Sequence, residues 1–327
     1  MAFRNAWTFK PAPWTPFADQ EVLDKVMKMD FHEEEGKHFE NPDFELKCVY
    51  DARNYFSTDL FQRIRLSDVK DEKLVLVLPS PENSVYISLV ENLNKFNVSA
   101  RNVEVFFFDE YANGKGEVAP WQSPYSKAGQ WMKYFYQRLR AELRMPMEQI
   151  HFWTAENAAS YSDELAAAGG ADVVYCEMSW TGLRYIDAES FPAETMDELM
   201  AMGSRIVTPM MEQLCLDSLR GMFGASGDIS NVPPCVASIG PKDLKAAKEV
   251  VCYNFLTSAN GANNLQKPCL QLAMFGPVCP KNPGSLLRLL PGTCYVSMQV
   301  SAPTGFQPDN DWLAEKLDEI RKAEGGC

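Results

Sequence analysis

The sequence predicts an α/β fold, a doubly wound and mostly parallel sheet with helices on both faces. Short runs that are almost continuously apolar alternate with longer amphipathic stretches, and such runs are typical of strands buried on both faces of a parallel sheet. The 327 residues are 46% apolar, which is enough for a substantial core. No internal repeat or low-complexity run interrupts the alternation, so the alternation itself defines the organisation.

We expect residues 1–45 to form an N-terminal extension, with prolines at 11, 13 and 16, one helix and an acidic stretch, and residues 46–327 to form a single α/β domain. The strands are short apolar runs, and the helices between them carry apolar residues at helical spacing. In chain order the expected strands are 73–78, 104–108, 150–153, 172–176, 235–239, 249–256 and 294–300. The expected helices are 19–29, 51–66, 83–95, 126–143, 156–168, 204–219, 241–247, 260–272 and 311–323.

The composition narrows the function classes. A formal net charge of −13 leaves no basic surface for a nucleic acid, so we expect no nucleic-acid partner. No stretch approaches about 18 consecutive apolar residues, and the N-terminus lacks the apolar core of a signal peptide. We therefore expect a cytoplasmic protein with no membrane partner. The nine cysteines include no C-x-x-C pair, which favours reduced core residues over disulfides or a zinc site.

An acidic pair directly follows one of the expected strands. Asp109 and Glu110, followed by Tyr111, come after the apolar run at 105–108. Because ligands of such sheets bind beyond the carboxyl ends of the strands, this pair is the first candidate for catalysis. The alternatives are a helix cap or loop hydrogen bond for Asp109 and a surface salt bridge for Glu110.

Five segments in order resemble the glucosamine-6-phosphate isomerase/deaminase family, which is related to the 6-phosphogluconolactonases. Each is weak alone, but together they span about residues 45–303 and are hard to obtain by chance. They are 105–111, 149–157, 169–174, 236–250 and 276–287. The resemblance implies a Rossmann-like fold of the deaminase type, a sugar or sugar-phosphate ligand, no cofactor, and an aldose–ketose proton transfer with Asp109 as base. Homo-oligomer formation is left open, because members of the family assemble in different ways.

The resemblance is broken where the family carries its proton relay. After the strand at 172–176 the family has an Asp, a His and a Glu, whereas this chain has Thr181, Leu183 and Ala188. Leucine neither accepts nor donates a proton, and a positioned acid or base typically contributes ~10²–10⁴-fold to the rate. The family's glycine between the first two positions is kept. Residues that offer a substitute group are Arg184, Asp187 and Glu189.

The phosphate-binding loop is also altered. The family uses a Gly-rich loop and a helix N-terminus after the strand at 73–78, because free N–H groups favour an anion. Here Pro81 removes a donor and Glu82 adds a carboxylate, so we expect weak phosphate binding, with Arg184, Lys281 and Arg288 as replacement cations.

Alternatives are helix N-capping for Ser80, Asn83 and Ser84 and loop packing for Trp180, Arg184 and Tyr185. The ligand-binding candidates are Ser80, Glu82, Asn83, Ser84, Trp180, Thr181, Gly182, Arg184 and Lys281.

Two functions stay open at this point. The first is a sugar-phosphate isomerase/deaminase with Asp109, Glu110 and rearranged partners, and the second is a degenerate scaffold that binds a carbohydrate-like small molecule without that activity. In a third possibility the extension covers the cleft of an interaction protein.

No Walker loop or G-x-G-x-x-G motif occurs, so no nucleotide cofactor is expected. His32 and His38 lie six apart, which is not the spacing of a helical metal pair, so we expect no metal site and a solvated charged face there.

Overall fold

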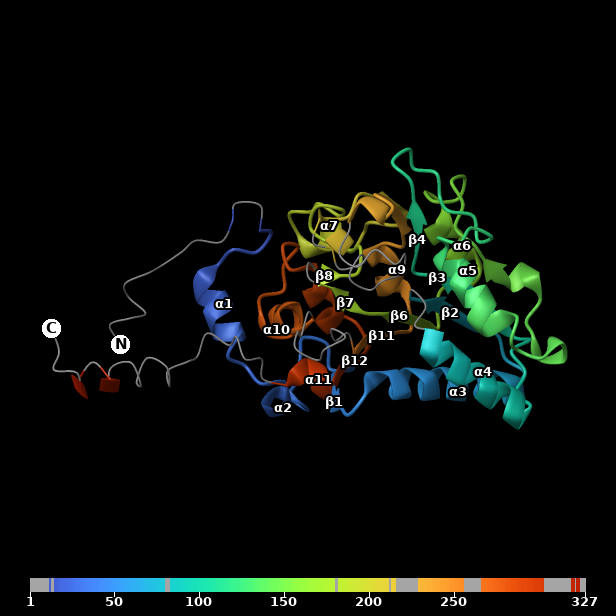
Figure 1. Cartoon of the computed structure of the whole chain (residues 1–327), viewed down its shortest axis with the longest axis horizontal. Coiled ribbons are helices and arrows are strands. Elements are labelled where there is room, and N and C mark those ends of the chain that lie inside the picture. The colour runs from blue at the N-terminus through green and yellow to red at the C-terminus, as the bar shows by residue number, and fades with distance from the viewer. Residues whose placement is uncertain are drawn as a thin grey trace.

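A seven-stranded parallel sheet forms the centre of the molecule (Figure 1). The computed structural model describes residues 12, 15–79, 83–179, 182–211, 213–215, 229–255, 266–302, 319–320 and 322–323. The sheet has the order β1-β12-β11-β6-β2-β3-β5, and each neighbouring pair is parallel. The predicted α/β fold is therefore confirmed. The strands are β1 Phe44–Val49, β2 Leu74–Leu78, β3 Val103–Phe107, β5 Ile150–His151, β6 Val173–Cys176, β11 Glu249–Asn254 and β12 Gly292–Ser297.

Two small antiparallel sheets are added to the central one. β10, Cys235–Ser238, pairs with β4, Asp109–Ala112, and with β9, Arg205–Val207. The expected strand at 235–239 therefore exists, but it lies outside the parallel sheet. The expected helix at 204–219 is wrong at its start, because those residues form β9 instead. The second small sheet is a short hairpin of β7, Met178–Ser179, and β8, Gly182–Leu183.

Helices cover both faces of the central sheet (Figure 1). Side chains alternate along β3: the ring of Phe106 contacts Tyr161 of α6, whereas Phe107 contacts Trp131 of α5 on the opposite face. On the α5 side, α3, α4 and the π-helical segment η1 pack together, and on the α6 side α9 packs against α6. The helices are α1 Gln20–Val26, α2 Phe31–Glu34, α3 Ala52–Lys70, α4 Asn83–Phe96, α5 Lys127–Trp131, η1 Met132–Tyr136, α6 Tyr161–Ala167, α7 Met196–Leu199, α9 Pro241–Ala246, α10 Lys267–Phe275 and α11 Met298–Ser301, with 3-10 turns η2 Ala141–Leu143, η3 Met147–Gln149, η4 Ile229–Asn231 and η5 Pro283–Leu289.

Several expected boundaries differ from the structure. The sequence does not predict β1, because Glu45 and Lys47 interrupt its apolar residues. The structure accommodates both charged side chains because β1 is an edge strand, where they reach water. The expected helix at 126–143 is α-helical only to Trp131, and the expected strand at 294–300 ends at Ser297, where α11 begins. Much of the expected helices at 260–272 and 311–323 lies outside the described residues.

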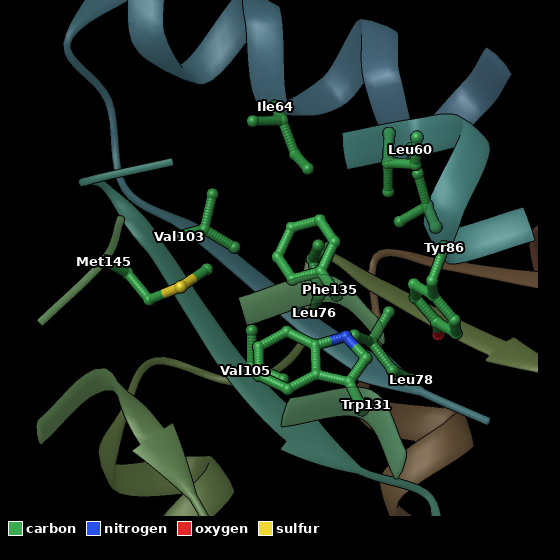
Figure 2. A pocket seen from close by; sticks show the side chains of 11 residues that line it. Leu60, Ile64, Leu76, Leu78, Tyr86, Val103, Val105, Trp131, Phe135 and Met145 are labelled. Atoms are coloured by element: carbon green, nitrogen blue, oxygen red, sulfur yellow. The ribbon is translucent and has the colours of Figure 1, made fainter. Parts of the chain in front are cut away.

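The core between the sheet and the helices α3 and α4 consists mainly of apolar side chains. Figure 2 shows a small cavity there, lined by side chains from α3, α4, β2 and β3 together with Trp131, Phe135 and Met145. None of the lining residues is charged, so we interpret the cavity as a packing gap in the core. Within the described part of the chain, no helix combines the length and apolarity that crossing a membrane requires.

The N-terminal residues pack against α10 and the turn η5. Gln271 of α10 donates hydrogen bonds to the carbonyl oxygens of Met27 and Met29, at 3.1 and 2.9 Å. The ring of Phe31 contacts that of Phe275 at a centroid distance of 5.3 Å. These contacts lie at the β1 end of the sheet, away from the strand β3 that carries the acidic pair. That residues 1–45 are a separate extension of one domain stays a prediction.

Candidate active site

Asp109 lies where the chain leaves the carboxyl end of β3. The N–H of Phe108 donates to the carbonyl of Leu78, at the end of the neighbouring strand β2, at 2.7 Å. The N–H of Ile239 donates to the carbonyl of Phe108 at 3.0 Å, which starts the pairing of β10 with β4. The chain therefore passes from the parallel sheet into the antiparallel one within two residues. Asp109 is held at this junction and is only 2% exposed.

Two buried cations hold the Asp109 carboxylate. Lys127 Nζ lies 2.6 Å from Asp109 Oδ1, and Arg184 Nε lies 3.7 Å from Asp109 Oδ2. Lys127 and Arg184 are 1% and 2% exposed. Arg184 also forms an ion pair with Glu177, so two carboxylates and two cations balance one another inside the protein. Buried charges persist in proteins when they are paired in this way.

Tyr185 completes this cluster. Lys127 Nζ donates to the Tyr185 hydroxyl at 2.8 Å, and Arg184 Nη2 donates to the same oxygen at 3.3 Å. The Lys127 ammonium also lies over two aromatic rings, 4.0 Å from the centroid of Tyr111 and 4.2 Å from that of Tyr185. Tyr185 has a φ of 58°, a left-handed conformation that is uncommon for a residue other than glycine. Asp109, Glu177, Lys127, Arg184 and Tyr185 are called the charged cluster below.

Lys127 is not among the site residues that the sequence predicts. It is the first residue of α5, and a cation at a helix N-terminus is disfavoured by the helix dipole. Such a placement was the one indication in the sequence that this lysine has a partner elsewhere. Its pairing with Asp109, 18 positions earlier, is set by the tertiary structure.

Glu110 caps the helix that carries Lys127. Its carboxylate accepts hydrogen bonds from the N–H groups of Lys127 and Ala128, both at 3.0 Å, and from the Ser126 hydroxyl at 2.6 Å. Burial raises the pKa of Glu110, although these donors oppose the rise. The side chain is therefore a buried helix cap rather than part of a surface salt bridge. Through α5 it positions Lys127 against Asp109.

Gly182 and Leu183 form the strand β8, which directly precedes Arg184 and Tyr185 of the charged cluster in the chain. A Cβ on Gly182 would lie 2.7 Å from Pro283 Cγ and 2.8 Å from the carbonyl oxygen of Ile186, so the close approach requires glycine here. Leu183 is fully buried. Its side chain therefore fills space in the core at the position where the family is expected to carry its histidine.

Two other residues that were predicted to substitute for missing family groups, Asp187 and Arg288, bind partners outside the charged cluster. The Asp187 carboxylate accepts hydrogen bonds from the N–H groups of Glu189 and Ser190, which stabilises a turn. Arg288 is buried; it forms an ion pair with Glu40 and donates to two carbonyl groups, and its role as a replacement phosphate ligand stays a prediction.

The remaining ligand-binding candidates are only partly described. Asn83 and Ser84 open α4, and the buried Oδ1 of Asn83 has no hydrogen-bond partner within the described part of the chain. Lys281 is exposed. Four candidates lie outside the described residues, namely Ser80, Glu82, Trp180 and Thr181.

Comparison with known proteins identifies the fold. No family model matches the chain. A solved monomeric glucosamine-6-phosphate deaminase is 16% identical, covers 78% of this chain and 98% of its own, and superimposes with a TM-score of 0.60. The 6-phosphogluconolactonase of Thermotoga maritima is 13% identical over 78% of this chain and 99% of its own, with a TM-score of 0.53. That of Trypanosoma cruzi is 12% identical over 81% of this chain and 98% of its own, also at 0.53. The resemblance predicted from the sequence is thereby confirmed at the level of the fold.

Proposed function

We propose that this chain is a small-molecule-binding protein that uses the deaminase and lactonase fold without the deaminase reaction. One observation carries the proposal: the Asp109 carboxylate is closed from solvent and held by Lys127 and Arg184. A base that removes a proton from a substrate carbon must reach that carbon at hydrogen-bond distance. The Lys127 ammonium, 2.6 Å from Oδ1, occupies the place of a substrate proton on that oxygen, and the burial of Asp109 keeps a substrate from the other oxygen.

The buried Leu183 supports the same conclusion. It stands where the resemblance places the histidine of the proton relay, and Asp187, the nearest carboxylate in sequence, is hydrogen-bonded within its own turn. The ligand that we propose is carbohydrate-like, because the solved structures with this fold include a glucosamine-6-phosphate deaminase and a 6-phosphogluconolactonase. Of the three expected replacement cations, Arg184 and Arg288 are held by carboxylates and Lys281 is exposed, so phosphate binding is expected to be weak.

A second candidate is an isomerase/deaminase with a rearranged relay, and Tyr185 favours it. Its hydroxyl accepts hydrogen bonds from both Lys127 and Arg184, so it is placed between the two cations. Tyr185 and Lys127 would then move the proton that the missing histidine moves in the family. The left-handed backbone of Tyr185 fits such a role, because strained conformations gather at functional sites.

Calorimetry and turnover together separate the two candidates. The purified protein is titrated with glucosamine and with glucosamine 6-phosphate, and ammonia release is followed in the same samples. We expect heat of binding with glucosamine, weaker binding of the phosphate ester, and no ammonia from either. Ammonia release that is abolished by Asp109→Asn and by Tyr185→Phe, but kept by the surface variant Lys133→Met, would contradict the scaffold proposal and support the second candidate.

A further inference from the structure

Three side chains with metal-binding atoms converge at the junction between the N-terminal residues and the sheet. One ring nitrogen of His32, one carboxylate oxygen of Glu35 and the Sγ of Cys48 all lie within 4.8 Å of one another. His32 lies in α2 and Glu35 directly follows its last residue, whereas Cys48 comes from the edge strand β1. The site is thus built by tertiary structure and has no spacing motif in the sequence.

Hydrogen bonds already orient two of these side chains. The N–H of Cys48 donates to Glu35 Oε1 at 3.0 Å, which holds the carboxylate beside the thiol. His32 Nε2 lies 3.3 Å from the hydroxyl of Ser301, at the end of α11. An oxygen partner on one ring nitrogen is the arrangement that fixes a metal-binding histidine, because it leaves the other nitrogen available as a ligand.

The chemistry of the three groups selects the class of ion. A thiolate, an imidazole and a carboxylate are ligands of zinc, and together they carry a formal charge of −2 that a divalent ion neutralises. His32 and Glu35 are exposed and Cys48 is half-buried, so an ion reaches the site from solvent. The net charge of −13 attracts cations to the molecule as a whole.

We propose that His32, Glu35 and Cys48 bind one divalent zinc-like ion, with a fourth position left to water. The ion links α2 to β1 and so ties the N-terminal residues to the edge of the sheet. Binding deprotonates the Cys48 thiol, and the released proton passes to solvent. This site is independent of the charged cluster at Asp109, since the two share no residue.

Cobalt substitution tests this proposal on the full chain, after treatment with a chelator and a reductant. Titration with Co²⁺ is expected to saturate at one ion per chain, to give a thiolate-to-cobalt absorption band, and to be reversed by Zn²⁺. Cys48→Ser should abolish the band, and His32→Gln should weaken binding roughly tenfold or more. The matched controls Cys279→Ser and His38→Gln should leave the band and the affinity unchanged.

Two results would overturn the proposal. The first is Co²⁺ binding without the charge-transfer band, and the second is a band that persists in Cys48→Ser. Circular dichroism of each variant shows whether it has folded. A Zn²⁺-dependent rise in the melting temperature of the wild type that is absent from folded His32→Gln supplies an independent readout.

Discussion

At the scale of single residues, the charged cluster shows how burial constrains an acid at the carboxyl end of a strand. Asp109 follows an apolar strand, and the sequence therefore marks it as a candidate base. In the folded protein its carboxylate is paired with Lys127 and lies near Arg184, and each of these groups is at most 2% exposed. Removal of one partner from such a pair leaves a charge without compensation in a medium of low polarity.

Replacement of Lys127 by methionine is therefore expected to destabilise the protein by about 3–5 kcal/mol. Asp109→Asn in the same chain should recover most of that loss, because the uncompensated carboxylate is then neutral. Urea unfolding of the two single variants and the double variant measures the coupling. The exposed Lys133→Met serves as control and should change stability by less than about 0.5 kcal/mol. A loss in the double variant equal to the sum of the two single losses would show that the pairing does not matter.

At the scale of elements, β12 depends on its first residue. Gly292 has a φ of 152° and lies between β1 and β11, where its backbone pairs with Phe44 and Val250. A Cβ at this position would lie 1.9 Å from the carbonyl oxygen of Val250. The close approach of the strands therefore requires glycine, and the strand cannot begin here with another residue without a shift of the backbone.

Gly292→Ala is expected to lower the free energy of unfolding by about 3 kcal/mol or more, because both the positive φ and the steric overlap oppose the methyl group. Gly114→Ala is the matched control, since its Cβ would meet only Pro234 Cγ, at 3.8 Å. Thermal unfolding of both variants in parallel is the measurement. A melting temperature of Gly292→Ala equal to that of the control would refute the steric argument.

At the scale of the whole molecule, Arg288 joins the N-terminal residues to the domain. Its guanidinium forms an ion pair with Glu40 and donates to the carbonyl oxygen of Gly276 at 2.6 Å. Burial alone would raise the pKa of Glu40, but the hydrogen bonds and the charge of Arg288 outweigh it and hold the pKa below its ordinary value of 4.5. The contact therefore favours the ionised carboxylate.

The stability that Glu40 adds should be complete above pH 4.5 and should be lost as the pH falls through the lowered pKa of the folded state. Glu40→Gln is accordingly less stable than the wild type at pH 7, and the two approach each other as the solution becomes acidic. Chemical unfolding at several pH values from 7 downward measures the difference. The exposed Glu148→Gln should show no such convergence, and a constant gap for Glu40→Gln would contradict the ion-pair explanation.

The sequence by itself determined the α/β class, the mostly parallel sheet of buried strands and the location of Asp109 at a strand end. These features follow from local patterns, because continuously apolar runs predict buried strands and topology directs ligands to their carboxyl ends. The five segments that resemble the deaminase family identified the fold even though solved relatives are only 12–16% identical.

Only the tertiary structure decided what surrounds those residues. The pairing of Lys127 with Asp109, the joining of β1 to the sheet and the meeting of His32 with Cys48 all connect separate elements. A strand with exposed charges at a sheet edge has no distinctive apolar run. The residue type of a lysine also does not tell whether its side chain is buried or exposed. Such contacts depend on how elements pack, and packing is a property of the whole chain that no local pattern contains.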